Sequence, residues 1–200
     1  MENIILASAS PRRKKLLEQL GLYFQVHPSS KSENYNPKLP PRDIVQHLAQ
    51  HKAQDVAQQF QSGLIIGADT IVAHNQQILE KPRDRTEARS MLKQLACDTH
   101  SVFTGVAFCQ RNNRLDDLKI CTFFEETKVA FGPLQPQDIA AYVKNGSPMD
   151  KAGAYGIQDD YGSLFVKSIE GDYNTVVGLP VHRLYQELLK FAPQYLKKSL

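Results

Sequence analysis

The stretch LASASPRRKKLLEQLG, Leu6 to Gly21, decides how the first part of the chain folds. Pro11 is typical of the first residue of a helix because it lacks the N–H that a first turn leaves unpaired, and Ser10 is a favourable N-cap. Four basic residues, 12–15, then follow where the helix dipole is already positive, which costs roughly a few tenths of a kcal/mol each. The arrangement is therefore mildly unfavourable unless an anion lies among them.

An apolar strand is expected just before this loop, over residues 3–7. A strand, a loop and a helix N-terminus in this order form an anion-binding cradle in outline. The hydroxyls of Ser8 and Ser10 and the guanidinium groups of Arg12 and Arg13 suit a polyphosphate, since arginine grips phosphate oxygens through paired N–H bonds. The alternative is a plain capped helix with solvated basic residues.

Composition narrows the class of protein. The 200 residues, 42% hydrophobic and 22% charged, are typical of one globular domain. The net charge of +3 is small and scattered, so no nucleic-acid partner is expected. Three cysteines without a C-x-x-C pattern indicate a reducing compartment. No apolar run approaches the roughly 20 residues of a membrane span and no secretion signal is visible, so we expect a cytoplasmic protein without a membrane partner.

Mixed α and β elements are predicted along the chain. Helices are expected from Pro11 to just before Gly21 and over residues 43–61, 86–96, 136–145 and 181–191. Strands are expected over residues 3–7, around Phe24 and Val26, on both sides of a turn at Asn75-Gln76, and over 101–108, 121–131 and 163–169. Residues 170–180 are expected to form a turn, and the tail 192–200 is expected to be frayed.

Asp69 lies inside the apolar strand LIIGADTIV. An aspartate there is costly to bury unless a metal, a cation or a catalytic role compensates for it. The alternative, suggested by Gly67, is a turn residue at the end of a strand.

The predicted hairpin adds two neighbours to Asp69. A turn between Asn75 and Gln76 places Thr70 opposite Lys81, with paired Cβ atoms about 5 Å apart. A carboxylate, a hydroxyl and an ammonium group would then share one small patch. The alternative for Lys81 is a solvated ion pair between strands.

A glycine-rich loop, MDKAGAYGIQ, covers residues 149–158. Gly153 and Gly156 would let the backbone approach a ligand, while Lys151 and Gln158 reach it. Such loops are common, so this one alone is weak support for a binding site.

Seven motifs occur in the order in which they occur in the Maf family of nucleotide pyrophosphatases, and the chain resembles that family from about Ile4 to Phe191. The motifs are LASASPRR, GADTIV, EKPRD, TGVAF, ETKVAF, DKAGAYGIQ and GDYNTVVGLP. The resemblance implies an α/β fold related to the inosine triphosphate pyrophosphatases: an elongated mixed sheet flanked by helices, in one domain (1–191) of two lobes with a central cleft. It also implies hydrolysis of a nucleoside triphosphate to the monophosphate and pyrophosphate, by a homodimer that uses a divalent cation, Mg²⁺ or Mn²⁺.

The resemblance also implies roles for individual residues. The S-x-S-x-x-R signature falls on Ser8, Ser10 and Arg13, the catalytic aspartate on Asp69, the acidic loop residue on Glu33, and the family's lysines on Lys52 and Lys81. The loop around Glu33, KSENYNP, departs from the more acidic form that members often carry.

These assignments predict a mechanism. The metal ion would bridge phosphate oxygens and Asp69, with Glu33 helping to hold it. Asp69 would accept a proton from the attacking water, while Arg13, Lys52 and Lys81 neutralise charge as pyrophosphate departs. A carboxylate cannot fully serve as metal ligand and base at once, and the sequence leaves open which role dominates.

The resemblance also implies a specificity for the base of the nucleotide, through three further positions. Arg12, Thr70 and Gln158 match the subgroup that acts on thymidine and uridine triphosphates and on ring-modified pyrimidines. A glutamine amide can pair with the N3–H and a carbonyl of uracil or thymine. The alternatives are the sister subgroup that prefers 7-methyl-GTP, and a nucleotide-binding regulator related to cell division for which hydrolysis is incidental.

Overall fold

The computed structural model describes residues 3–31, 34–111, 118–146, 148–158 and 161–196. In these ranges seven strands form one sheet: β1 (Ile4–Leu6), β2 (Phe24–Val26), β3 (Gly63–His74), β4 (Gln77–Leu79), β5 (Thr99–Arg111), β6 (Leu118–Phe131) and β7 (Val166–Glu170). The α-helices are α1 (Pro11–Glu18), α2 (Pro41–Ala57), α3 (Arg85–Leu95), α4 (Pro136–Asn145), α5 (Gly162–Phe165), α6 (Tyr173–Val177) and α7 (Val181–Phe191). Short 3₁₀ helices are η1 (Pro148–Asp150), η2 (Ala152–Ala154) and η3 (Pro193–Tyr195). The predicted mixed α/β fold, a sheet flanked by helices, is confirmed.

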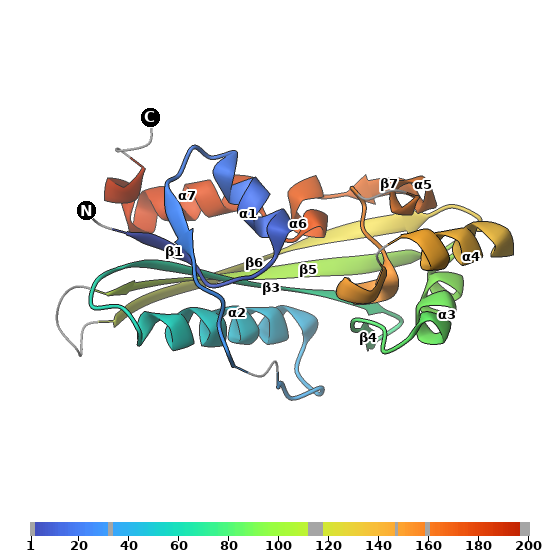
Figure 1. Cartoon of the computed structure of the whole chain (residues 1–200), viewed down its shortest axis with the longest axis horizontal. Coiled ribbons are helices and arrows are strands. Elements are labelled where there is room, and N and C mark those ends of the chain that lie inside the picture. Colours follow the sequence, from blue (N-terminus) through green and yellow to red (C-terminus); the bar gives the residue numbers. More distant parts are fainter. Residues whose placement is uncertain (1–2, 32–33, 112–117, 147, 159–160, 197–200) are drawn as a thin grey trace. The chain divides into compact units, whose positions relative to one another are not determined.

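The strand order β2-β1-β3-β5-β6-β7, with β4 on β3, explains where a ligand would bind. Strand β1 is parallel to both of its neighbours, β2 and β3. The chain reaches β2 through α1 on one side of β1, and then reaches β3 through α2 on the other. Because such crossovers are right-handed, α1 and α2 cover opposite faces of the sheet (Figure 1). The carboxyl end of β1 is therefore a switch point, the usual ligand site of parallel α/β sheets.

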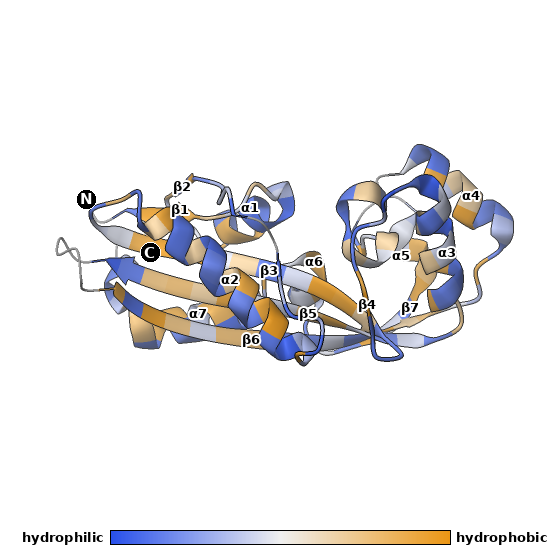
Figure 2. Cartoon of the chain, turned by 90° about the horizontal axis from the view of Figure 1, so that it is seen from below, coloured by the Kyte–Doolittle hydropathy of each residue, from blue (hydrophilic) through white to orange (hydrophobic). Residues whose placement is uncertain are grey.

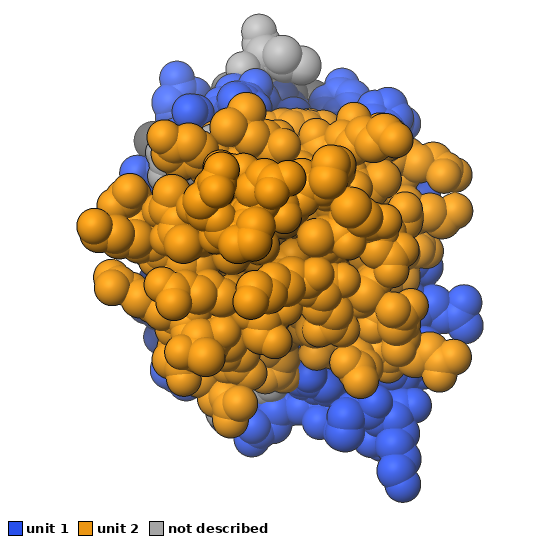
Figure 3. All heavy atoms as spheres, turned by 90° about the vertical axis from the view of Figure 1, so that its right-hand side faces the viewer, with its two compact units in different colours: residues 1–69, 104–125, 178–200 blue, residues 70–103, 126–177 orange. Residues whose placement is uncertain are grey.

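The chain divides into two compact units, which Figure 3 shows in different colours. Unit 1 consists of residues 1–69, 104–125 and 178–200, and unit 2 of residues 70–103 and 126–177. The long strands β3, β5 and β6 contribute residues to both units.

Unit 1 builds a core where α2 packs against β1, β3 and β5. Its buried members are mostly small or β-branched: Ile5, Ala7, Ala49, Ala53, Val56, Ala57, Ile65, Ala107 and Cys109. A Cβ added to Gly67 would lie 2.3 Å from the carbonyl oxygen of Ala49, so the helix rests directly on the strand backbone. Figure 2 shows mainly hydrophobic strands behind α2. This close packing fixes α2 against the middle of β3.

Unit 2 contains the hairpin of β3 and β4. Asn75 and Gln76 both have positive φ (49° and 64°), as a type I′ turn requires, and Val72 pairs with Leu79, so the predicted turn is confirmed. The ladder nevertheless ends at Leu79, and Lys81 does not pair with Thr70 as predicted. Just beyond the ladder, the carbonyl of Glu80 accepts a hydrogen bond from the N–H of Gly153 (3.2 Å).

Three other segments differ from the sequence prediction. Residues 163–165 belong to the short helix α5, so strand β7 begins only at Val166. The expected turn 170–180 contains α6, whose first turn is held by the Asp172 carboxylate accepting the backbone N–H of Thr175 at 2.9 Å. The expected frayed tail is wrong over 192–196, because the apolar side chains of Tyr195 and Leu196 are buried; residues 197–200 lie outside the described ones.

Candidate functional site

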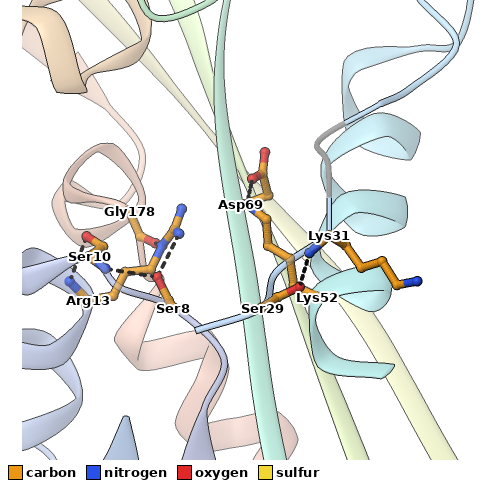
Figure 4. Close-up of polar contacts among 8 residues, drawn as sticks. All are labelled: Ser8, Ser10, Arg13, Ser29, Lys31, Lys52, Asp69 and Gly178. Carbon is orange, nitrogen blue, oxygen red and sulfur yellow. Dashed lines mark hydrogen bonds and ion pairs between the residues drawn. The ribbon is translucent and has the colours of Figure 1, made fainter. Parts of the chain in front are cut away.

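The loop after β1 arranges two hydroxyls and one guanidinium group around α1. Ser10 is the N-cap, and its oxygen accepts the backbone N–H of Arg13 at 3.4 Å. The oxygen of Ser8 accepts the backbone N–H of Ser10 (3.2 Å) and Nη1–H of Arg13 (3.3 Å) (Figure 4). Because both hydroxyl oxygens act as acceptors inside the loop, their own protons remain to be donated. This is the polarity that an anion requires.

Arg13 is held by a second group that the sequence analysis did not single out. Its Nε–H donates to the carbonyl oxygen of Gly178 at 2.8 Å, across 165 residues of sequence (Figure 4). Gly178 belongs to the motif GDYNTVVGLP, which marked the segment but indicated no partner for it.

Asp69 is buried in the middle of β3 and forms an ion pair with Lys52 of α2. The carboxylate Oδ1 lies 2.6 Å from the ammonium Nζ, and the two side chains are only 9% and 13% exposed. Strand β3 continues to His74, which excludes the turn alternative for Asp69. Side chains alternate along a strand, so Asp69 faces the same side as Gly67, the side on which α2 packs. The helix thereby supplies the cation that compensates for burial of the carboxylate (Figure 4).

The register of the parallel strands brings the loop and the ion pair to the same level of the sheet. Leu6 of β1 pairs with Ile66 of β3. The N–H of Ala7 donates to the Ile66 carbonyl at 2.8 Å, so the loop that starts at Ser8 leaves the sheet beside the part of β3 just before Asp69. The hydroxyls, the guanidinium group and the carboxylate–ammonium pair thus gather at the carboxyl end of β1, all within unit 1.

A carboxylate of α2, Asp55, anchors the segment that follows β2. It is buried and accepts the hydroxyl of Ser29 (2.7 Å) and the backbone N–H of Ser30 (3.0 Å). The hydrogen bond from Ser29 is the largest cause that lowers the pKa of Asp55. In turn, Ser29 accepts the backbone N–H of Lys31 at 3.1 Å (Figure 4). The sequence analysis did not find Asp55; its signal is a carboxylate one turn after Lys52 among apolar neighbours.

The other predicted site residues are placed as follows. Glu33 lies outside the described residues. Arg12 is partly exposed on α1, and Thr70, the first residue of unit 2, is half-buried beside Asp69 along β3. Lys81 and Gln158 are exposed residues of unit 2, after β4 and at the end of the glycine-rich loop.

Lys151 differs from its expected role of reaching a ligand. Its side chain is 4% exposed, and its ammonium lies 2.8 Å from the carboxylate of Asp150. This ion pair joins two neighbouring residues at the start of the glycine-rich loop.

Carboxylate oxygen is the donor type that Mg²⁺ prefers. Among the residues that the structure describes, no three His, Cys, Asp or Glu side chains gather as a metal-binding group. The carboxylate of Asp69, 9% exposed, offers oxygen donors of this type. Within the same part of the chain, no helix combines the length and apolar character needed to cross a membrane.

Comparison with known proteins finds matches to a family model, to curated relatives and to a solved structure. The family model of Maf-like proteins matches residues 3–191. A protein of Bacillus anthracis named dTTP/UTP pyrophosphatase is 47% identical over 191 residues, 96% of each chain. A protein of Salinibacter ruber with the same name is 45% identical over 185 residues, 92% of this chain and 89% of the relative. A solved structure of a HAM1 protein from Coxiella burnetii is 19% identical and covers 65% of this chain and 74% of that one, with a TM-score of 0.39.

Proposed function

The chain belongs to the Maf family, and we propose that it hydrolyses dTTP and UTP to the nucleoside monophosphate and pyrophosphate. The observation that carries this proposal is the buried Asp69–Lys52 pair level with the Ser8–Arg13 loop. A triphosphate needs donors and cations, its hydrolysis needs a base, and these groups supply both. The activity named for the relatives supports the choice of substrate.

The proposed reaction uses each group of the site in one step. Ser8, Ser10 and Arg13 donate hydrogen bonds to phosphate oxygens. Asp69 accepts a proton from the attacking water. Lys52, 2.6 Å from Asp69, neutralises the carboxylate in the free protein and can neutralise phosphate charge when the substrate is bound. The resemblance to the family adds Lys81 as a further cation.

A divalent cation, Mg²⁺ or Mn²⁺, is part of the proposal. Asp69 and Glu33 would hold it together with the substrate phosphates. To the extent that Asp69 binds the ion it cannot also accept the proton, so the two roles are alternatives for this carboxylate. The ion supplies charge neutralisation on the phosphate oxygens. The chain's own residues orient the substrate and accept the proton.

The proposal also covers the oligomeric state and the cellular compartment of the protein. The resemblance to the Maf family implies a homodimer, which the mass of the protein in solution tests. We place the protein in the cytoplasm, which fractionation of cells tests.

A panel of nucleoside triphosphates, assayed for pyrophosphate under multiple turnover, tests the proposed function. We expect dTTP and UTP to be hydrolysed well above ATP and GTP, because an amide at Gln158 can pair with the N3–H and a carbonyl of thymine or uracil. Buried polar groups left unpaired reject a wrong base strongly. The variant Gln158→Glu removes the amide donor and should reduce the preference.

Two results of the panel would overturn the proposal. Release of pyrophosphate from GTP or 7-methyl-GTP at least as efficiently as from dTTP and UTP would place the chain with the sister subgroup. Binding without release of pyrophosphate from any common or modified triphosphate would indicate a nucleotide-binding regulator.

A further inference from the structure

Two N–H groups of the Arg13 guanidinium donate to acceptors inside the protein. Its Nε–H donates to the Gly178 carbonyl at 2.8 Å, and Nη1–H donates to the Ser8 hydroxyl at 3.3 Å. A guanidinium group is planar, so bonds from Nε and Nη1 together fix the plane and its rotation. Figure 4 shows the group between Ser8 and Gly178.

Gly178 is a rigid acceptor. It is buried between Val177 and Leu179, which are 6% and 0% exposed. Three residues later α7 begins, where the N–H of Leu184 donates to the carbonyl of the N-cap Pro180 at 2.8 Å and Leu184 is buried. The position of the Gly178 carbonyl is thus fixed by the N-terminal end of the packed helix α7.

The backbone at Gly178 also requires glycine. Its φ is 122°, a conformation that residues with a Cβ rarely adopt. Glycine adopts this conformation without strain, and here its carbonyl accepts a hydrogen bond from a side chain of the site.

We propose that the Gly178 carbonyl is a positioning group, which holds the Arg13 guanidinium in the orientation that grips the substrate phosphates. The proposal rests on the proposed function. The Gly178 carbonyl is an acceptor and cannot bind phosphate itself. It accepts the Nε–H of Arg13, the guanidinium N–H that does not belong to the two terminal nitrogens. A group fixed before binding loses less conformational freedom when the phosphate arrives.

A double-mutant cycle tests the proposal. Gly178→Ala should lower kcat/KM for dTTP about tenfold, because alanine disfavours φ of 122° and turns the carbonyl away from Nε. Lysine at position 13 has no Nε–H, so in an Arg13→Lys background the same substitution should change kcat/KM less than about twofold. Equal effects in both backgrounds would show that Gly178 acts independently of Arg13, which overturns the proposal.

Gly171 provides the matched control. Its φ is 128°, and a Cβ there would lie 2.7 Å from the hydroxyl of Thr127, so Gly171→Ala carries a similar strain. We expect this variant to lower the melting temperature but to leave kcat/KM within about twofold of the unmodified protein. A tenfold loss of kcat/KM in Gly171→Ala would mean that strain alone explains the result at Gly178.

A measurement on the unmodified chain keeps the proposal testable if Gly178→Ala does not fold. In ¹⁵N-labelled protein, the Nε–H of Arg13 should exchange with water at least tenfold more slowly than that of the exposed Arg89. Equal exchange rates would overturn the proposal. This readout needs no turnover, so a protein that releases no pyrophosphate refutes the proposed function while the exchange still decides the role of Gly178.

Discussion

At the scale of single residues, the site depends on one compensated pair of charges. The carboxylate of Asp69 and the ammonium of Lys52 are both largely buried and only 2.6 Å apart. Removing one partner of such a pair leaves the other charge uncompensated, which is more costly than losing an exposed ion pair. The pair therefore links the chemistry of the site to the stability of the fold.

Asp69→Asn tests both the chemical and the structural contribution of Asp69, through kcat and the melting temperature respectively. The amide keeps the shape of the carboxylate but cannot accept the proton, so kcat should fall about 100-fold or more. Lys52 also loses its counter-charge, so the melting temperature should fall. Asp43→Asn, on the first turn of α2, is the control and should leave kcat unchanged. Near-normal turnover of folded Asp69→Asn would remove Asp69 from the mechanism.

At the scale of elements, α2 places both Lys52 and Asp55. The helix approaches β3 closely because position 67 has no side chain: a Cβ there would lie 2.3 Å from the Ala49 carbonyl oxygen and 2.9 Å from the Ala53 Cβ. Backbone atoms cannot move aside as the end of a flexible side chain can. The distance between Lys52 and Asp69 is therefore a consequence of helix-on-strand packing.

Gly67→Ala should move α2 away from β3. Overpacking of this kind costs about 1–3 kcal/mol of unfolding free energy, and the displaced Lys52 should also lower kcat. Gly132→Ala is the matched control, because a Cβ at Gly132 would meet nothing within 4 Å, and its unfolding free energy should change little. Chemical denaturation of both variants, together with their kcat values, is the measurement. Equal stability of the two variants would contradict the packing argument.

At the scale of the whole molecule, folding should depend on pH through His100. This side chain is 2% exposed, and its Nε2 lies 2.7 Å from the hydroxyl of Tyr155. Its Nδ1 has no hydrogen-bond partner among the described residues. Burial, and then the charge of His74, lower the pKa of His100 from 6.5 to about 4, against the opposing effect of Asp98.

The sign of the effect follows from proton binding. Between pH 6.5 and about 4 the unfolded chain protonates His100 while the folded chain keeps it neutral, so stability falls as the pH falls. At about 1.4 kcal/mol per pH unit, the loss reaches roughly 3 kcal/mol. The lowered pKa of Asp55 acts mainly below its ordinary value of 3.8, outside this window.

Urea denaturation at pH 7, 5.5 and 4.5 measures the effect. In His100→Gln the side chain does not titrate. As the pH is lowered from 7 to 4.5, the unfolding free energy of this variant should therefore decrease less than that of the unmodified protein. His182→Gln, on the exposed surface of α7, should keep the original pH dependence. If His100→Gln keeps it too, another group is responsible.

Several features were predictable from the sequence because they depend on neighbouring residues. The Ser10 cap and Pro11 set the start of α1, and Asn75-Gln76 set the turn of the hairpin. The apolar surroundings of Asp69 marked it as a carboxylate that needs compensation, and the structure supplies Lys52. The order of the motifs placed the chain in the Maf family before any fold was known.

The tertiary structure alone decided which distant groups meet. The bond between Arg13 and Gly178 joins positions 165 residues apart, and that between Ser29 and Asp55 joins positions 26 apart. The ladder of β3 and β4 ends at Leu79, and just beyond it the distant Gly153 donates its N–H to the Glu80 carbonyl. Tyr195 and Leu196 are buried rather than frayed. No local propensity encodes these contacts, because each depends on how the packing of helices and strands closes a loop.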